Sequence, residues 1–157
     1  MTHSAQASAE ATDTSAPRRR WLGVLARAPR ETLEAALATL DPAPSWTRLR
    51  GPETGLIMVR GRIGGDGAPF NLGEMTVTRC SVALACGTVG HAWLAGRDQR
   101  RAELAAVCDA LLQTALFARL HEVLIEPEAR REAAEREHLR RRAAATRADF
   151  HTLVRMG

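Results

Sequence analysis

The spacing of apolar residues changes from helical to extended and back to helical along the chain. Residues 18–40 carry apolar side chains at helical intervals on both sides of Pro29, which predicts two short helices. Residues 99–117 repeat apolar side chains on one face, and Asp98 stands where the N-cap of this predicted helix belongs. Between these regions apolar and polar residues alternate, which is typical of β-strands. This order of elements predicts an α+β fold.

Four extended segments are predicted in the central region of the chain. Short stretches rich in Gly and Pro separate them, and the segments cover residues 46–50, 55–63, 73–84 and 88–95. Four strands joined by short turns form a four-stranded antiparallel meander. We expect the helix at 99–117 to cover the apolar face of this sheet, because its own apolar stripe needs a partner surface.

The second extended segment predicts sheet faces of different chemistry. Ile57, Val59 and Ile63 are assigned to one face, and Arg60 and Arg62 to the other, because side chains alternate across a strand. One face of the sheet is therefore expected to be apolar and the other partly cationic.

Two features interrupt the regular alternation of the predicted sheet. Val77 and Cys80 lie in different phases, which predicts a β-bulge near residues 78–79. The Gly-Gly-Asp-Gly sequence at 64–67 has two interpretations: it is a plain hairpin turn, or its backbone N–H groups cradle a phosphate. No helix follows this glycine-rich loop, which favours the hairpin turn.

The end of the chain has the pattern of a projecting arm. A last helix is predicted to begin near Pro127, where Glu and Arg recur at a spacing of four and large apolar residues are few. Such a helix packs weakly on its own core. The segment after it contains Phe150, Leu153 and Val154, which we expect to dock onto another chain.

Three parts of the chain are predicted from these patterns. Residues 1–17 lack large apolar groups and are expected to form a disordered tail, since they cannot repay their ordering entropy. Residues 18–125 form the α+β core domain, and residues 126–157 form the C-terminal helical arm and docking segment. No signal peptide and no membrane span is visible, so we expect a cytoplasmic protein without a membrane partner.

All the basic side chains of the chain are Arg. The 157 residues include 22 Arg and no Lys, and the formal net charge is +4. Schiff-base enzymes and P-loop enzymes are excluded, because both need a lysine amine. Guanidinium groups bind phosphates as planar forks. The candidates for contact with an anion on the sheet are Arg60, Arg62, Arg79 and Arg97.

The remaining titratable residues predict no catalytic set in this chain. Cys80, Cys86 and Cys108 are interpreted as reduced core residues, because their spacing suits neither a disulfide framework nor a zinc ribbon. His91 is interpreted as a partly buried structural residue, and the other histidines are too scattered for a metal site. Arg triplets at 18–20 and 140–142 lack a nucleic-acid motif, so no nucleic-acid partner is expected.

Several short sequence blocks, in a fixed order, resemble the PhnG family. The strongest are Glu-Thr-Gly-Leu at 53–56, Arg60, Arg62, Gly-Gly-Asp-Gly at 64–67, Gly-Glu at 73–74, Thr-Arg at 78–79, Gly-Thr-Val-Gly at 87–90 and Gly-Arg-Asp at 96–98. The resemblance covers about residues 18–156, and the chain departs from the family mainly in its longer N-terminal tail.

The resemblance implies a role in phosphonate catabolism through the carbon-phosphorus lyase pathway. Proteins of this family act in a core complex with PhnH, PhnI and PhnJ subunits. The complex moves the ribose 5-triphosphate of ATP or GTP onto an alkylphosphonate with loss of the base. The PhnI subunit is held to carry the nucleoside-cleaving chemistry, and PhnJ, with an iron-sulfur cluster and S-adenosylmethionine, breaks the carbon-phosphorus bond. This chain is therefore expected to be a non-catalytic subunit without a cofactor, inactive in isolation.

Two alternatives from other functional classes stay open at this point. One is a stand-alone enzyme acting on a phosphorylated small molecule, with His91 and Arg97 in its site. The other is a nucleic-acid accessory protein, which predicts binding that weakens steeply with salt because released counterions drive it. The substrates, the stoichiometry of the complex and any direct contact with nucleotide cannot be obtained from the sequence.

Overall fold

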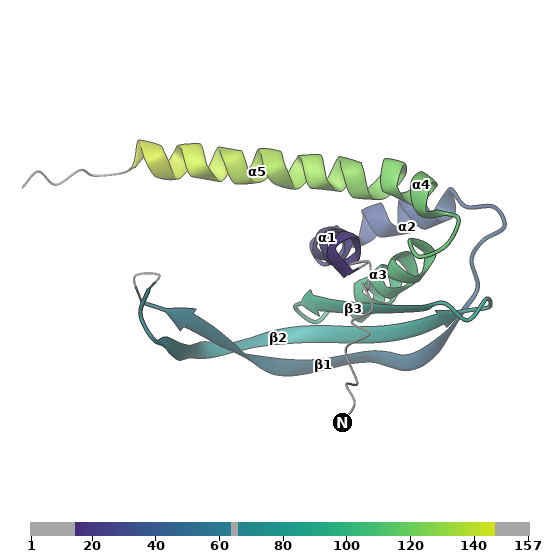
Figure 1. Cartoon of the computed structure of the whole chain (residues 1–157), viewed down its shortest axis with the longest axis horizontal. Helices are drawn as coiled ribbons and strands as arrows, with labels where there is room; N and C mark the ends of the chain where they lie inside the picture. Colours follow the sequence, from purple (N-terminus) through teal and green to yellow (C-terminus); the bar gives the residue numbers. More distant parts are fainter. Residues whose placement is uncertain (1–14, 64–65, 147–157) are drawn as a thin grey trace, which may run out of the picture.

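The computed structural model describes residues 15–63 and 66–146, and these residues form an α+β fold with the helices on one side of the sheet (Figure 1). The predicted helices before and after Pro29 are confirmed. The elements are, in order, α1 (Ser15–Leu25), α2 (Arg30–Ala38), β1 (Trp46–Arg62), β2 (Pro69–Leu84), β3 (Val89–Ala95), α3 (Gln99–Leu111), α4 (Phe117–Leu120), the π-helix η1 (His121–Ile125) and α5 (Glu126–Ala145).

The described part of the chain contains a three-stranded antiparallel sheet in the order β1-β2-β3, so the predicted four-stranded meander is wrong. The segments predicted at 46–50 and 55–63 form a single strand, β1. Gly51 and Pro52 signalled a turn, but they lie in an irregularity of the register, between Arg50 opposite Ser81 and Glu53 opposite Arg79. A proline is tolerated there because β1 is an edge strand and the ladder already skips this position.

The bulge predicted near residues 78–79 is also wrong. Thr78 and Arg79 pair in regular register with β1, and the irregularities nearby fall on β1 instead. The change of phase has another cause. Val77 is buried on the face of the sheet that points away from α3, called the open face below, while its neighbour Thr78 is buried on the face that points toward α3. The side chains of these two adjacent residues are therefore both buried, one on each face of the sheet.

Helix α3 forms the centre of the core by packing on β2, β3 and α2. Its N-cap is the predicted one, since Asp98 accepts a hydrogen bond of 2.9 Å from the Arg101 backbone N–H. The helix ends at Leu111 rather than at 117, because the Thr114 hydroxyl donates to the Leu111 carbonyl and closes the last turn. Completely or almost completely buried side chains around it include Leu25, Leu33, Val82, Leu104, Val107, Leu112, Leu120 and Leu124.

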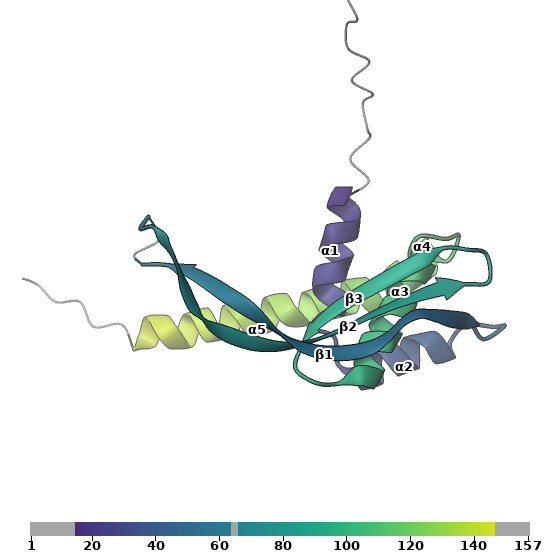
Figure 2. The ribbon, with the colours of Figure 1, turned by 90° about the horizontal axis from the view of Figure 1, so that it is seen from below.

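Strand β3 pairs with β2 only from Val77 to Ala83, so the other ends of β1 and β2 extend beyond it as a two-stranded ribbon (Figure 2). Residues 55–62 and 69–76 of this ribbon are called the hairpin arm below. The expectation that a helix covers Ile57 and Ile63 is wrong, because these side chains are 36% and 74% exposed. Ile57 lines the same hollow as Arg79 and Trp93, on the face of the sheet that points away from α3, so α3 does not cover it.

Helix α5 continues from α4 through η1 and extends to the same side of the molecule as the hairpin arm (Figure 1). Its buried residues are Glu128 and Glu132, and Pro127 lies in its first turn as predicted. No helix of the described residues is long and apolar enough to cross a membrane. The predicted docking residues Phe150, Leu153 and Val154 lie outside the described residues, and α1 begins at Ser15, inside the segment predicted as a tail.

Candidate functional site

The face of the sheet that points away from α3 carries a row of three paired residues. Glu53 lies opposite Arg79 in β2, and Arg79 lies opposite Trp93 in β3. Arg79 donates hydrogen bonds of 2.9 and 3.1 Å to Glu53 Oε2, and its guanidinium carbon lies 5.5 Å from the centre of the Trp93 ring. The ion pair and the cation–π contact together hold the guanidinium between Glu53 and Trp93.

A hollow of about 220 Å³ lies beside this row, over Gly55. A side chain at Gly55 would meet no atom within 4 Å, so the hollow exists because this residue has none. Ile57 and Val77 form apolar walls, and Arg79 supplies a cation at the rim. The hollow therefore offers apolar walls beside the ion pair of Arg79 with Glu53.

Beneath the open face, two threonine hydroxyls tie the three strands together. Thr54 Oγ1 lies 3.1 Å from Thr78 Oγ1, which donates a hydrogen bond of 2.8 Å to the Gly96 carbonyl. Gly96 has φ +94°, a left-handed conformation that favours glycine. The sequence blocks at 53–56, 78–79 and 96–98 therefore meet in one place. Their adjacency could not be found from sequence, because it depends on the strand register.

The four arginines predicted to contact an anion are not gathered into one site. Arg79 lies in the row just described, and Arg97 follows Gly96 at the end of β3 and is exposed. Arg60 is seven residues along β1 from Glu53, roughly 23 Å at the rise of a strand. Arg62 lies near the hairpin turn and donates a hydrogen bond of 3.1 Å to the Gly67 carbonyl. Of the predicted loop at 64–67, the first two residues lie outside the described residues.

His91 is exposed, so its interpretation as a partly buried residue is wrong. Its Nδ1 atom lies 2.9 Å from Ser81 Oγ, a neighbour that only the strand register supplies. Asp109 does not complete a relay, because its carboxylate accepts from the backbone N–H of His91 rather than from the ring. Arg97 lies beyond the end of β3 at Ala95, which is itself roughly 13 Å from His91 at the rise of a strand. His91 and Arg97, the two residues assigned to the site of a stand-alone enzyme, therefore do not lie together.

Two buried carboxylates on α3 were missed by the sequence analysis, and the first is Asp109. This fully buried side chain accepts hydrogen bonds of 2.7 and 3.2 Å from Arg18, and of 2.9 Å from both Trp21 Nε1 and the His91 backbone N–H. Its oxygens are occupied by donors from α1 and β3. Asp109 therefore joins three elements, which is a structural role. The sequence did contain a signal for this role, because Asp109 is an acidic residue among the apolar residues of the predicted helix.

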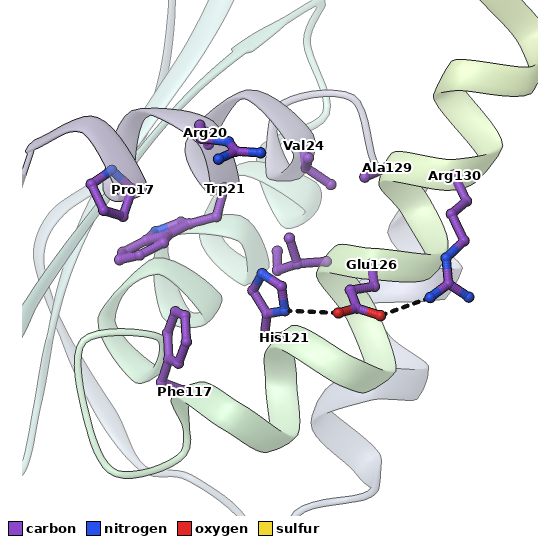
Figure 3. Close-up of a pocket in the computed structure, with 10 residues that line it drawn as sticks. Pro17, Arg20, Trp21, Val24, Phe117, His121, Glu126, Ala129 and Arg130 are labelled. Atoms are coloured by element: carbon purple, nitrogen blue, oxygen red, sulfur yellow. Dashed lines mark hydrogen bonds and ion pairs between the residues drawn. The ribbon is translucent and has the colours of Figure 1, made fainter.

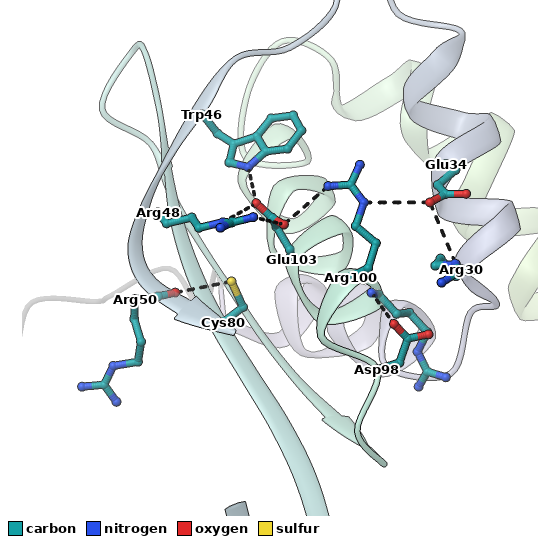
Figure 4. Close-up of polar contacts among 10 residues, drawn as sticks. Arg30, Glu34, Trp46, Arg48, Arg50, Cys80, Asp98, Arg100 and Glu103 are labelled. Atoms are coloured by element: carbon teal, nitrogen blue, oxygen red, sulfur yellow. Dashed lines mark hydrogen bonds and ion pairs between the residues drawn. The ribbon is translucent and has the colours of Figure 1, made fainter. Parts of the chain in front are cut away.

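The second buried carboxylate, Glu103, joins α3 to the start of β1 (Figure 4). It accepts hydrogen bonds of 2.8 and 2.9 Å from Arg48, 2.9 Å from Trp46 Nε1 and 3.4 Å from Arg100. The hydrogen bonds from Arg48 lower the pKa of Glu103 from 4.5 to about 2, against the opposing effect of burial. Such a carboxylate stays ionised and does not donate protons near neutral pH.

A second cavity of about 430 Å³ lies between α1 and the continuous helix from α4 to α5 (Figure 3). Trp21 and Phe117 form part of its lining, with ring centres 5.7 Å apart. At the rim His121 Nδ1 lies 3.6 Å from Glu126, which accepts a hydrogen bond of 2.8 Å from Arg130. The lining contains no Ser, Thr or Cys, so this cavity is suited to binding rather than to nucleophilic catalysis.

The cysteines divide into two environments. Cys80 and Cys108 are buried as predicted, and burial raises the pKa of Cys108 to about 12. Cys86 is exposed, so its interpretation as a core residue is wrong. Its Sγ atom lies 3.3 Å from Thr88 Oγ1, and this hydrogen bond lowers the pKa of the thiol. In residues 15–63 and 66–146, no three His, Cys, Asp or Glu side chains form a cluster that could hold a metal ion.

Comparison of the chain with known proteins identifies its family. The model of the family described as "Phosphonate metabolism protein PhnG" matches residues 16–156. The chain belongs to the PhnG family. A curated relative from Rhizobium meliloti (strain 1021), named "Alpha-D-ribose 1-methylphosphonate 5-triphosphate synthase subunit PhnG", is 50% identical over 140 residues, which are 89% of this chain and 90% of the relative. The family membership inferred from the short sequence blocks is confirmed.

Proposed function

We propose that this PhnG-family chain is a non-catalytic subunit of a complex that transfers the ribose 5-triphosphate of ATP or GTP to an alkylphosphonate with loss of the base. The name of the Rhizobium meliloti relative, a subunit of a ribose 1-methylphosphonate 5-triphosphate synthase, supports this reaction. The match covers nearly all of both chains. The protein would thus act in phosphonate catabolism, in the cytoplasm, and would be inactive in isolation.

The observation that carries the subunit role is the exposed apolar surface of the hairpin arm. A two-stranded ribbon is marginally stable in water, and an apolar patch of this kind usually marks a contact with another protein. Large apolar side chains at least one-third exposed on the arm and its turn are Leu56, Ile57, Met58, Ile63, Phe70, Leu72 and Met75. The arm therefore gives the chain a surface that a partner subunit can bury.

The chemistry is assigned to partner subunits, which we propose are PhnI, PhnH and PhnJ. The two buried carboxylates of α3, Glu103 and Asp109, are occupied by structural hydrogen bonds. In this proposal PhnI cleaves the nucleoside, and the iron-sulfur cluster and S-adenosylmethionine belong to PhnJ in the following step. ATP or GTP is a substrate of the complex, and this chain holds no cofactor.

A positioning role for Arg60, Arg62 or Arg79 extends this proposal. Departure of the base develops positive charge on the ribose, while the triphosphate and the phosphonate are anionic. A guanidinium supplied across a subunit interface would hold these anions in place. Arg79 is already held by Glu53 and Trp93, which favours a fixed position over a mobile one. A triple Ala variant that assembles and keeps full transferase activity would remove this role.

The docking role proposed for Phe150, Leu153 and Val154 is tested separately. Replacing Phe150 and Leu153 with Asp would weaken partner recovery, since a buried charge at an interface is strongly unfavourable. Unchanged recovery would show that the interface lies elsewhere.

The subunit role is tested by affinity purification of the tagged chain, at native level, from phosphate-starved cells growing on methylphosphonate. Mass spectrometry then identifies the proteins recovered. Stoichiometric recovery of PhnI, PhnH and PhnJ supports the proposal. Recovery of the chain alone, together with nucleotide turnover by that chain, would contradict it and favour a stand-alone enzyme.

A further inference from the structure

Strand β2 has an open edge where β3 ends. On the β3 side of β2, the last backbone hydrogen bond runs from the Gly96 N–H to the Thr76 carbonyl, at 2.9 Å. The position beside β2 that continues the line of β3 beyond this bond is called the empty lane below. Beyond this point, among the residues that the structure describes, residues 69–75 of β2 pair with β1 only. In an antiparallel ladder alternate residues bond to alternate sides, so the N–H and C=O of Glu74 point into the empty lane.

The two free edges of the hairpin arm differ in how they resist further pairing. Within the arm the β1 edge carries the charges of Arg60 and Arg62. The β2 edge at 70–75 is Phe-Asn-Leu-Gly-Glu-Met, with a single charge, and its pairing with β1 skips one residue, Leu72, between Gly73 opposite Val59 and Asn71 opposite Arg60. Charges protect natural edge strands from unwanted partners. The β2 edge carries fewer charges and continues in line with β3, so it is the edge favoured here.

Exposed apolar side chains of β2 itself lie beside the empty lane. Phe70, Leu72 and Met75 are 39%, 66% and 40% exposed. A strand added along this edge would lie next to these groups, so it should carry apolar residues that bury them.

We propose that an extended apolar segment of a partner subunit binds along residues 70–75 of β2 as an added strand, in line with β3. This inference rests on the proposed subunit function and specifies the contact surface. A partner subunit is favoured over a second copy of the chain because the related protein is a subunit of a synthase, and the arm's exposed apolar surface continues around the same edge. Main-chain hydrogen bonds give such strand addition its affinity.

The test uses the full chain with its partners, by tagged purification of the complex from cells. Glu74→Pro removes one N–H from the empty lane and breaks no bond to β1, and the preceding Gly73 tolerates the backbone that a proline imposes. Met58→Pro is the matched control, because Met58 is the cross-strand partner of Glu74 and its N–H points to the other edge. Glu74→Ala controls for the lost carboxylate.

We expect Glu74→Pro to lower recovery of the partner by about tenfold, whereas Glu74→Ala and Met58→Pro change it little. Hydrogen exchange gives a second reading: the Glu74 amide of the wild-type chain should be protected in the complex and exchange fast in the isolated chain. Equal recovery of all variants with a fast-exchanging Glu74 amide in the complex overturns the strand addition. Protection at Glu74 in a purified homodimer instead identifies a second copy as the occupant and also overturns it. A wild-type chain that recovers no subunit overturns the proposed function itself.

Discussion

Arg48 at the start of β1 donates two hydrogen bonds, of 2.8 and 2.9 Å, to the buried carboxylate of Glu103 in α3. This contact fixes the edge strand to the helix that forms the core. The Glu103 side chain is 4% exposed and the Arg48 side chain is 57% exposed, so the pair joins the interior to the surface.

The Glu103 contact makes stability depend on pH in the acid range. The folded pKa of Glu103 is lowered from 4.5 to about 2, so its contribution is complete above the unfolded value and is lost as pH falls through the folded value. We expect Glu103→Gln to lower the free energy of unfolding by about 2 kcal/mol at neutral pH. Urea unfolding at several pH values measures this difference.

The difference between wild type and Glu103→Gln should shrink between about pH 5 and pH 2, because the Glu103 carboxylate binds a proton in the unfolded chain at a higher pH than in the folded chain. A difference that stays constant over this range would show that Glu103 acts through packing alone. Glu53→Gln is a suitable control, since its partner Arg79 lies on the exposed face.

Asp109→Ala should be more destabilising than any change on the sheet surface. It leaves Trp21 Nε1 and the His91 backbone N–H without their acceptor and frees Arg18, so α1 loses its polar attachment to α3. The expected loss is about 3–5 kcal/mol, the range for breaking a buried charged contact. Thermal unfolding followed by circular dichroism measures it, and a fall below about 1 kcal/mol would contradict the structural role.

Gly90→Ala should disrupt the packing of β3 on α3. A Cβ atom at Gly90 would lie 2.0 Å from the Ala106 carbonyl oxygen and 2.6 Å from the Ala110 nitrogen, and neither backbone atom can move away freely. Overpacking of this kind destabilises by about 1–3 kcal/mol or more. Gly73→Ala is the control, because a Cβ there meets nothing within 4 Å. Equal melting temperatures for the two variants would contradict the close approach.

Ile57→Asp together with Leu72→Asp should prevent recovery of partner subunits without unfolding the chain. Both side chains lie on the hairpin arm and are 36% and 66% exposed, so their replacement affects an interface more than the core. Leu139→Asp on α5, where the side chain is 57% exposed, is the comparison. Loss of recovery with Leu139→Asp alone would place the main contact on α5 instead. Circular dichroism checks that each variant is folded.

The predictions that succeeded depend on local signals. The helices on both sides of Pro29, the N-cap at Asp98 and the start of α5 at Pro127 were found because capping and spacing act within a few residues. The failures at Gly51 and Pro52 arose because the same residues mark a turn in one setting and a bulge on an edge strand in another. Only the pairing with β2 distinguishes them.

The sequence by itself determined the family, the α+β class and the helices, since these follow from residue order and from interactions between near neighbours. The tertiary structure decided which residues share a site. It placed Glu53, Arg79 and Trp93 in one row, separated Arg60 from them, and left the hairpin arm without a helix over it. Strand register and helix length set these relationships, and both depend on contacts between residues that are distant in the chain.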